Sequence, residues 1–231
     1  MTRPPTAWLL PAAALSAALA IAAGPLGAAW LNFAFKPLTT LLVIAWAWPR
    51  GAGEGARRSW LRVGLVLSWF GDVALLWPTE GFVPGLVAFL LAHLAYIVAF
   101  TRGLRFGARP VPFVLYAIVA ALVLSQVWPG VPAGLRWPVL AYVAALACMA
   151  AQAAAVWLAA GHGIGHVLAR RAAIGGALFL ASDATLAWNR FLWPVPAAGF
   201  WILASYWLAQ AAIASSLQSA SNSPEDTSNR D

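Results

Sequence analysis

Long apolar runs separated by short polar connectors dominate the pattern of hydrophobic and polar positions along the chain. A helix that crosses the hydrocarbon core of a bilayer needs about 20 consecutive, mostly apolar residues. Counting such runs predicts membrane-spanning helices at residues 7–24, 28–48, 60–78, 82–101, 111–128, 136–159, 168–190 and 198–218. The pattern therefore predicts an all-α integral membrane protein, an eight-transmembrane-helix bundle.

The connectors between these runs are short and rich in Pro, Gly and Arg, as in residues 49–55. None is long enough to hold a soluble domain. We therefore expect a single transmembrane domain over residues 1–218. Residues 219–231 are rich in Ser, Asn, Asp and Glu, which bury too little apolar surface to offset the entropy of ordering. This polar tail is expected to be disordered.

The composition indicates that the bilayer is the environment of the chain. Only 9% of the residues are charged and 62% are hydrophobic, the mean hydropathy is +0.78, and 14 tryptophans are available for the membrane interfaces. A soluble protein of 231 residues needs far more charge to cover its surface. The net charge of +7 comes from arginines clustered between apolar runs, so it does not indicate nucleic-acid binding.

Basic residues are distributed unequally between alternate connectors. One side of the predicted bundle carries Arg3, Arg50, Arg57, Arg58, Arg102, Arg105, Arg109, Arg170, Arg171 and Arg230. The other side carries only Arg136 and Arg190. Because connectors rich in Lys and Arg stay in the cytoplasm, we expect a multi-pass protein of the cytoplasmic (inner) membrane with both termini cytoplasmic. One alternative stays open, since the Ala-rich first run also resembles a cleavable signal peptide.

A weak internal repeat relates the third and seventh apolar runs. Residues 67–77, Leu-Ser-Trp-Phe-Gly-Asp-Val-Ala-Leu-Leu-Trp, align with residues 178–188, Leu-Phe-Leu-Ala-Ser-Asp-Ala-Thr-Leu-Ala-Trp, and each copy follows an Arg-Arg pair. Four predicted spans separate the copies, so both would cross the membrane in one direction, as in parallel repeats. Coincidence in a sequence of low diversity is the alternative.

Two aspartates, Asp72 and Asp183, lie inside predicted spans, whereas the other acidic residues fall in connectors or in the tail. A carboxylate at membrane depth costs a few kcal/mol, so it normally faces the bundle interior and has a partner or a function. Both should lie at similar depth in the non-cytoplasmic half of the membrane, where they could share one cavity. We interpret them as catalytic candidates. A structural ion pair or an interhelical hydrogen bond is the alternative.

Lys36, the only lysine, lies in the second run, one turn from Asn32 and one turn from Thr39 and Thr40. These residues make a polar stripe along one helix face, in the same half of the membrane as the aspartates. Lys36 is therefore a candidate to neutralise an aspartate or to bind a phosphate group. Snorkelling of its ammonium group toward the interface is the alternative.

Two pairs of polar residues share a helix face in the runs that follow the aspartate-bearing runs: His93 with Tyr96, and Tyr206 with Gln210. We expect them to bind the substrate or to support the aspartates, and we include Asn189 in this group. Bridging of helices by buried polar groups is the structural alternative. One cavity is expected to be lined by Asp72, Asp183, Lys36, His93 and Tyr206.

No metal or cofactor is expected. His162 and His166 have the spacing of a metal-binding pair on a helix, but they lie among glycines without a nearby carboxylate or cysteine. Cys148, the only cysteine, lies in an apolar run and is expected to serve packing. The chain lacks a Gly-x-Ser-x-Gly elbow, a phosphate-binding Gly-rich loop and a His-Glu-x-x-His motif. Paired carboxylates near a cation instead suit general acid and base catalysis on a lipid-soluble substrate.

Five short motifs occur in order along the chain. They are Lys36-Pro-Leu-Thr-Thr40, Gly71-Asp-Val-Ala-Leu75, Phe89-Leu-Leu-Ala-His-Leu-Ala-Tyr96, Ser182-Asp-Ala-Thr-Leu-Ala187 and Tyr206-Trp-Leu-Ala-Gln210. Together they resemble the YhhN-like lysoplasmalogenase family. The resemblance implies an eight-helix membrane hydrolase that cleaves the vinyl ether of lysoplasmenylethanolamine or lysoplasmenylcholine, giving a fatty aldehyde and the glycerophospho-alcohol. The family's two membrane aspartates correspond to Asp72 and Asp183.

The implied chemistry suits these residues. Protonation of the vinyl ether carbon creates an oxocarbenium-like centre, which a carboxylate stabilises while an activated water attacks. One aspartate would act protonated and the other ionised, and the sequence does not assign the two roles. Two alternatives stay open: a proton-coupled lipid or small-molecule transporter or binding protein, and a hydrolase of another ether lipid. The expected partners are a lysophospholipid substrate and the bilayer, and the oligomeric state is not determined.

Overall fold

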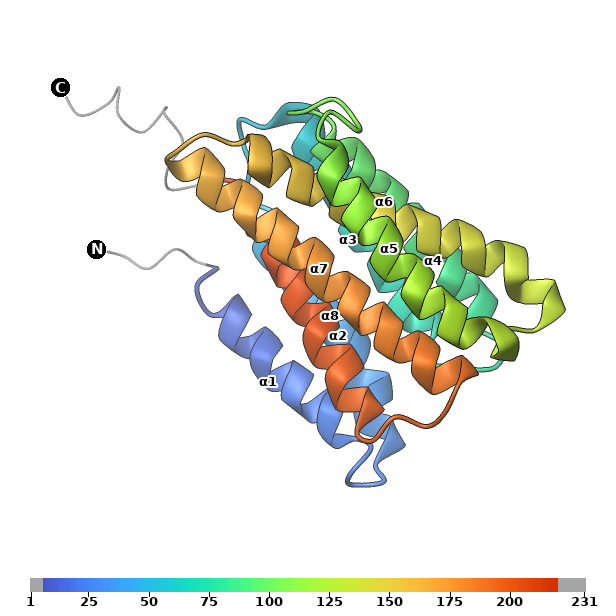
Figure 1. The fold of residues 1–231 in the computed structure, drawn as a ribbon. Coiled ribbons are helices and arrows are strands. Elements are labelled where there is room, and N and C mark those ends of the chain that lie inside the picture. The colour runs from blue at the N-terminus through green and yellow to red at the C-terminus, as the bar shows by residue number, and fades with distance from the viewer. Residues whose placement is uncertain (1–5, 220–231) are drawn as a thin grey trace.

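The structure, a computed structural model, describes residues 6–219, and every regular element among them is helical. Eight α-helices form one elongated bundle (Figure 1). They are α1 (Leu9–Ala22), α2 (Ala29–Ala47), α3 (Gly55–Ala74), α4 (Phe82–Phe100), α5 (Pro110–Val127), α6 (Arg136–Ala159), α7 (Ile164–Phe191) and α8 (Ala198–Ala214). Two short 3₁₀ helices, η1 (Trp128–Gly130) and η2 (Ala133–Leu135), connect α5 to α6. The all-α architecture is confirmed, and the predicted tail from residue 220 onward lies outside the described residues.

The lengths and compositions of the helices fit a multi-pass membrane protein. The segments long and apolar enough to cross a membrane number five: Ala29–Ala47, Phe82–Phe100, Pro110–Gly130, Ala133–Ala159 and Ile164–Phe191. Two further apolar helices are shorter, α1 with 14 residues and α8 with 17. Helix α3 has 20 residues but carries Arg57, Arg58 and Arg62 in its first half. Length and apolar composition therefore support five of the eight predicted spans.

The helix ends agree with the apolar pattern in α6 and depart from it in α3. Helix α6 begins and ends where predicted, at Arg136 and Ala159. Helix α3 was expected at residues 60–78 but covers Gly55–Ala74, because the arginine-bearing turn continues into the apolar run without a break. The helix ends early because the following connector folds back closely: a Cβ on Gly81 would lie 1.8 Å from the carbonyl oxygen of Ala74. Only glycine permits that approach.

The two aspartates lie in the hairpins α3–α4 and α7–α8, which pack extensively. In the first hairpin, a Cβ added to Gly64 would lie 2.2 Å from the ring of Tyr96, and one added to Gly71 would lie 2.5 Å from the ring of Phe89. Small residues of this kind let membrane helices approach closely. Gly71 therefore lets the ring of Phe89 pack beside the turn that carries Asp72, and Gly64 lets the ring of Tyr96 pack about two turns earlier on α3.

The second hairpin repeats this arrangement. Gly175, which lies three residues before the second copy of the predicted repeat as Gly64 lies before the first, packs against Ile213 and the carbonyl oxygen of Ala209 on α8. Ser182, which aligns with Gly71, donates a hydrogen bond of 3.0 Å to the carbonyl oxygen of Ile202 on α8. The residue that follows is an aspartate in both helices. Both hairpins therefore bring small residues of the aspartate-bearing helix against the following helix, but their partners lie at different positions.

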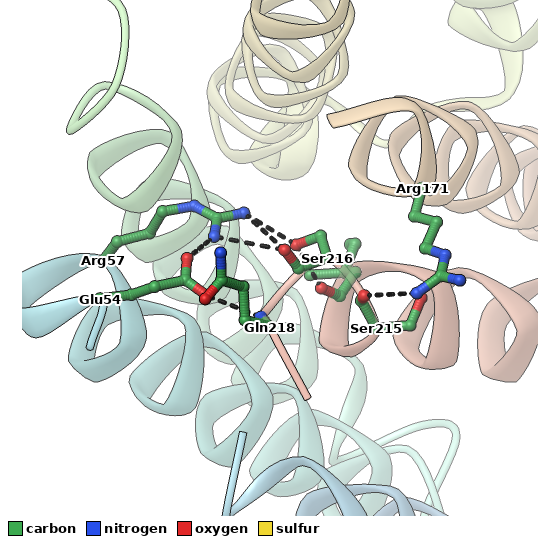
Figure 2. A network of polar contacts seen from close by, with 7 residues as sticks. Glu54, Arg57, Arg171, Ser215, Ser216 and Gln218 are labelled. Carbon is green, nitrogen blue, oxygen red and sulfur yellow. Dashed lines mark hydrogen bonds and ion pairs between the residues drawn. The ribbon is translucent and has the colours of Figure 1, made fainter. Parts of the chain in front are cut away.

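A polar cluster ties the end of α8 to the connector between α2 and α3, as Figure 2 shows. Glu54 forms an ion pair with Arg57 and accepts a hydrogen bond of 2.7 Å from the backbone N–H of Gln218. Arg57 donates hydrogen bonds to the hydroxyl and carbonyl oxygens of Ser216 at 3.0 and 3.3 Å. Arg171 donates one to the carbonyl oxygen of Ser215 at 3.2 Å. Because the last carbonyls of a helix lack partners within it, these arginines cap α8. We call these residues the clasp.

Candidate active site

The carboxylate of Asp72 lies in the last turn of α3 and is 1% exposed. The hydroxyl of Thr40 on α2 donates a hydrogen bond of 2.6 Å to its Oδ2. The hydroxyl of Tyr206 on α8 donates one of 2.7 Å to the same oxygen, and the indole N–H of Trp207 donates to the Thr40 oxygen at 3.1 Å. Asp72 therefore joins three helices through buried hydrogen bonds, which satisfy a carboxylate at membrane depth.

Gln210 extends this network toward α4. Its Nε2 donates a hydrogen bond of 3.2 Å to the hydroxyl of Tyr206, and its Oε1 accepts one of 2.7 Å from the hydroxyl of Tyr96. All three side chains are buried. Tyr206 and Gln210, which share a helix face, are thus joined by a hydrogen bond. Tyr96 bonds to Gln210 on α8 and not to His93, which shares its face of α4.

Lys36 lies one turn before Thr40 on α2 and is 7% exposed. Thr40, one turn further along the same helix, bonds to Asp72, but no direct ion pair joins Lys36 to Asp72 in the described part of the chain. Its neighbour Thr39 instead faces α1, where it donates a hydrogen bond of 2.8 Å to Ser16. Lys36 is thus placed to balance the charge of Asp72 without touching it.

Asp183 forms a second network with residues from α4 and α6. The hydroxyl of Tyr142 on α6 donates a short hydrogen bond to Asp183 Oδ2. The Nε2 of His93 on α4 lies 3.2 Å from the Tyr142 oxygen and 3.8 Å from the same Asp183 oxygen. His93 is fully buried, whereas the side chain of Asp183 is 12% exposed. Asp183 is therefore the more accessible of the two aspartates.

The partners of the His93 ring indicate which tautomer a neutral ring would adopt. Its Nδ1 is buried and has no hydrogen-bond partner among the described residues. A neutral imidazole carries one proton, and an unpaired buried N–H is rarer than an acceptor without a partner. We therefore assign the proton to Nε2, which donates to the Tyr142 oxygen, while the Tyr142 hydroxyl donates to Asp183.

Two phenylalanine rings separate the two networks. The ring of Phe179 packs edge-on against His93 and Tyr206, with centroids 4.7 and 5.4 Å apart. The ring of Phe89 packs against Phe179 and Tyr206 at 6.1 and 5.7 Å. The residues expected to line one cavity therefore fall into two groups, because aromatic packing occupies the space between them. One group contains Lys36, Asp72 and Tyr206, and the other contains His93 and Asp183.

Asp183 lines an apolar pocket between α4, α5, α6 and α7, with a volume of about 80 Å³. Its polar lining residues are Tyr142, Asp183 and Arg190, and the rest are Leu, Val, Ala and Phe. Helix α5 is the least buried of the five apolar segments, so the pocket lies close to lipid. An apolar pocket with few polar groups is typical of a site for a small hydrophobic ligand. It presents one carboxyl to such a ligand.

The structure places one predicted site residue outside both networks and brings two residues that the sequence did not single out to the pocket. Asn189 is exposed, and its Oδ1 accepts a hydrogen bond of 3.0 Å from the backbone N–H of Val195, so it holds the connector between α7 and α8. Tyr142 was missed because it lies in an Ala-rich run, although its hydroxyl is a rare polar group in that run. Arg190, which lines the pocket, entered the sequence analysis only through the unequal distribution of basic residues between connectors.

The described residues contain no group of three or more His, Cys, Asp or Glu side chains that could hold a metal ion. The spaced histidines lie at the beginning of α7 and in the connector before it. His166 accepts a hydrogen bond of 3.1 Å from the indole N–H of Trp157, and His162 lines a surface hollow beside it. This pair is therefore remote from both aspartate networks.

Comparison with known proteins identifies the family. The model of the YhhN family matches residues 31–217. The chain is 35% identical over 196 residues to lysoplasmalogenase TMEM86B of Sus scrofa (81% of this chain, 76% of that protein) and 34% identical over 193 residues to that of Homo sapiens (80% and 74%). It is 31% identical over 151 residues to the uncharacterized membrane protein YhhN of Escherichia coli O157:H7 (65% and 71%). No solved structure is significantly similar. Because the match includes α3 to α8 and both aspartates, the family resemblance is confirmed, and the chain belongs to the YhhN family.

Proposed function

We propose that this protein is a membrane hydrolase that cleaves the vinyl ether bond of lysoplasmalogens. Relatives that are 33% to 35% identical carry the name lysoplasmalogenase. The observation that carries the proposal is the position of Asp183, a carboxyl on the wall of an otherwise mostly apolar pocket. The first carbons of the alkenyl chain of a lysoplasmalogen would occupy this small pocket, the rest of the chain would lie in the lipid beside α5, and the one acid-labile bond would lie beside Asp183.

In the proposed mechanism, the Asp183 carboxyl is the general acid. Its proton forms a bond to the vinyl carbon that does not carry oxygen, which leaves an oxocarbenium ion on the neighbouring carbon. The carboxylate that remains stabilises this cation. Water then adds to the cationic carbon and loses a proton, which gives a hemiacetal. The hemiacetal breaks its bond to the glycerol oxygen and yields the fatty aldehyde and the glycerophospho-alcohol.

Tyr142 and His93 support this role of Asp183. The Tyr142 hydroxyl occupies Oδ2 of Asp183, so Oδ1 is the oxygen that would carry the transferable proton. The Nε2–H of His93 donates to Tyr142 and orients its hydroxyl. The two residues would thereby hold the carboxyl in one orientation toward the pocket, as a general acid requires.

Asp72 is proposed as the second carboxyl, which acts as general base toward the attacking water. Its enclosure favours this role, which is performed away from the lipid chain, because Asp72 is 1% exposed while Asp183 faces the pocket. Lys36 would balance its charge. The rings of Phe89 and Phe179 lie between the two networks, so this role requires that a water molecule pass these rings.

We also propose that all eight helices span the cytoplasmic membrane and that both termini are cytoplasmic. At about 1.5 Å per residue, α1 and α8 are about 21 and 25 Å long, and local thinning of the bilayer accommodates such mismatch at a modest cost. The clasp end of the bundle carries most of the arginines, which favours the cytoplasm for that end. A carboxy-terminal reporter fusion should therefore be active in the cytoplasm, and activity only outside would contradict this topology.

The decisive experiment is aldehyde release by the purified protein. Lysoplasmenylethanolamine should be cleaved, whereas the matched lysophospholipid with a saturated ether should stay intact, because it lacks the double bond that accepts the proton. In deuterium oxide, the aldehyde should carry one deuterium on the carbon next to the carbonyl. In H₂¹⁸O, the glycerol product should contain no heavy oxygen. Binding of both lipids without any aldehyde would instead favour a carrier.

A further inference from the structure

Arg190 lies in the last turn of α7 and lines the same pocket as Asp183. Its guanidinium Cζ is 4.9 Å from the ring centroid of Phe82, the first residue of α4. The side chain is exposed, and within residues 6–219 it forms neither an ion pair nor a side-chain hydrogen bond. Its N–H donors are therefore available at the mouth of a pocket whose wall carries a carboxyl.

The place of this charge is exceptional in the chain. Among residues 6–219, the arginines gather at the clasp end of the bundle, and only Arg136 and Arg190 lie in connectors or helix ends on the opposite side. Arg136 lies over the ring of Trp128, with its Cζ 5.3 Å from the centroid, and it does not line the pocket. A cation that borders an apolar pocket in a membrane protein normally has a partner or a function. The ring of Phe82 contacts the guanidinium of Arg190 but accepts no conventional hydrogen bond from it, so a bound anion would be the missing acceptor.

We propose that Arg190 binds the phosphodiester of the lysophospholipid and thereby sets the position of the vinyl ether relative to Asp183. The identity of the ligand rests on the proposed function. A planar guanidinium donates two parallel hydrogen bonds to phosphate oxygens, which fixes orientation as well as position. This contact recognises the phosphate that ethanolamine and choline lysolipids share, and it does not discriminate between their amines.

The spacing of Asp183 and Arg190 fits one lysolipid molecule. They are two helical turns apart on one face of α7, so their Cα atoms are separated by about 10.5 Å along the axis. Six bonds connect the oxygen-bearing vinyl carbon to the phosphorus, and an extended chain of six bonds covers about 7 Å. A hydrogen bond from guanidinium to phosphate adds about 2.8 Å. The phosphate can therefore contact Arg190 while the vinyl ether lies beside Asp183.

Kinetics with matched substrates test the contact. The Arg190→Gln variant should lose about 10- to 100-fold in kcat/KM for lysoplasmenylethanolamine, mainly through KM, because charged hydrogen bonds are removed. Arg190→Lys should retain part of the activity, because it keeps the charge. A 1-alkenylglycerol, which has the same vinyl ether without phosphate, should respond little to either change. Arg136→Gln, at the same end of the bundle but away from the pocket, should match the parent.

Binding measurements separate this site from the proposed reaction. The probes are an uncleavable alkyl-ether lysophosphoethanolamine and the corresponding alkylglycerol without phosphate. If Arg190→Gln weakens the binding of the phosphate probe but not of the alkylglycerol, the site is supported. This holds even if the parent protein releases no aldehyde, because the absence of aldehyde would overturn only the proposed hydrolase activity. Equal affinity of the parent and Arg190→Gln for the phosphate probe, or an equal loss for both probes, would overturn the role of Arg190.

Discussion

The hydroxyl of Tyr206 donates a hydrogen bond of 2.7 Å to the carboxylate of Asp72, 134 positions away in the chain. This bond joins the end of α3 to α8 inside the bundle. Buried groups in a membrane protein have little water to replace a lost partner, so breaking such a bond leaves the carboxylate under-satisfied. Asp72 therefore has an architectural role beside its proposed catalytic one, and the two roles need separate measurements.

Tyr206→Phe tests the architectural role. The change keeps the ring that packs against Phe89 and Phe179 and removes only the hydroxyl. We expect the free energy of unfolding to fall by about 1–3 kcal/mol, because Asp72 loses a buried donor. Thermal melting in detergent measures this. Tyr116→Phe is the matched control, since Tyr116 is only partly buried; equal melting of the two variants would contradict the bond's role.

Tyr142→Phe tests the support of Asp183. The hydroxyl is a donor to the carboxyl that faces the pocket, and the ring still packs against His93. We expect aldehyde release to fall by about 10- to 100-fold, the effect of losing one hydrogen bond to a charged or reacting group. The saturating rate per folded molecule is the measurement. An unchanged rate would mean that the orientation of Asp183 does not depend on Tyr142.

Removal of divalent metal ions should leave turnover unchanged. The described residues offer no group of three metal-ligating side chains, and Asp72 and Asp183 belong to separate networks. The proposed acid and base steps use only carboxyls and water. Aldehyde release should be measured before and after dialysis against a chelator. Loss of activity that one divalent ion restores would make at least one aspartate a metal ligand.

The clasp should contribute to stability and not to chemistry. Arg57→Gln removes the ion pair with Glu54 and the bonds to Ser216, far from the pocket that Asp183 lines. We expect a loss of about 1–2 kcal/mol in the free energy of unfolding, reduced from the buried value because the pair is partly exposed. Arg102→Gln, an exposed arginine in another connector, is the control. A lower rate per folded molecule would link the clasp to catalysis.

The helices were predictable because a bilayer demands long apolar runs, which a single sequence displays directly. Helix α6 begins and ends at the predicted residues, Arg136 and Ala159. Helix α3 does not, because counting apolar residues ignores a helical turn that carries arginines. The apolar pattern therefore locates the helices, whereas their ends depend on connectors such as the tight turn at Gly81.

The site was predictable in its residue types and not in its pairings. Tyr206 and Gln210 were paired correctly because a spacing of four puts them on one helix face. The bonds of Thr40 to Asp72 and of Tyr142 to Asp183 join different helices, so they depend on how the helices pack. The same packing inserts the aromatic rings between the two aspartates.

Replacing each aspartate by asparagine separates chemistry from architecture. The amide keeps the shape of the side chain but cannot transfer the proton, so each variant should lose about 10²–10⁴-fold in aldehyde release. Insertion should survive in both, because a neutral amide costs less than a carboxylate at membrane depth. Aldehyde release and melting temperature should therefore be measured together for Asp72→Asn and Asp183→Asn.

The two variants should differ in stability because their surroundings differ. At Asp183, the amide oxygen can still accept the bond from Tyr142, and the side chain is partly exposed to the pocket, so melting should stay close to the parent. At Asp72, the amide N–H groups would face the donors Thr40 and Tyr206 or remain unpaired, and Lys36 would lose its balancing charge. Melting should therefore fall further for Asp72→Asn. Near-normal turnover in Asp183→Asn would remove the proposed acid, and inactivity of Asp72→Asn explained wholly by unfolding would leave Asp72 an architectural residue.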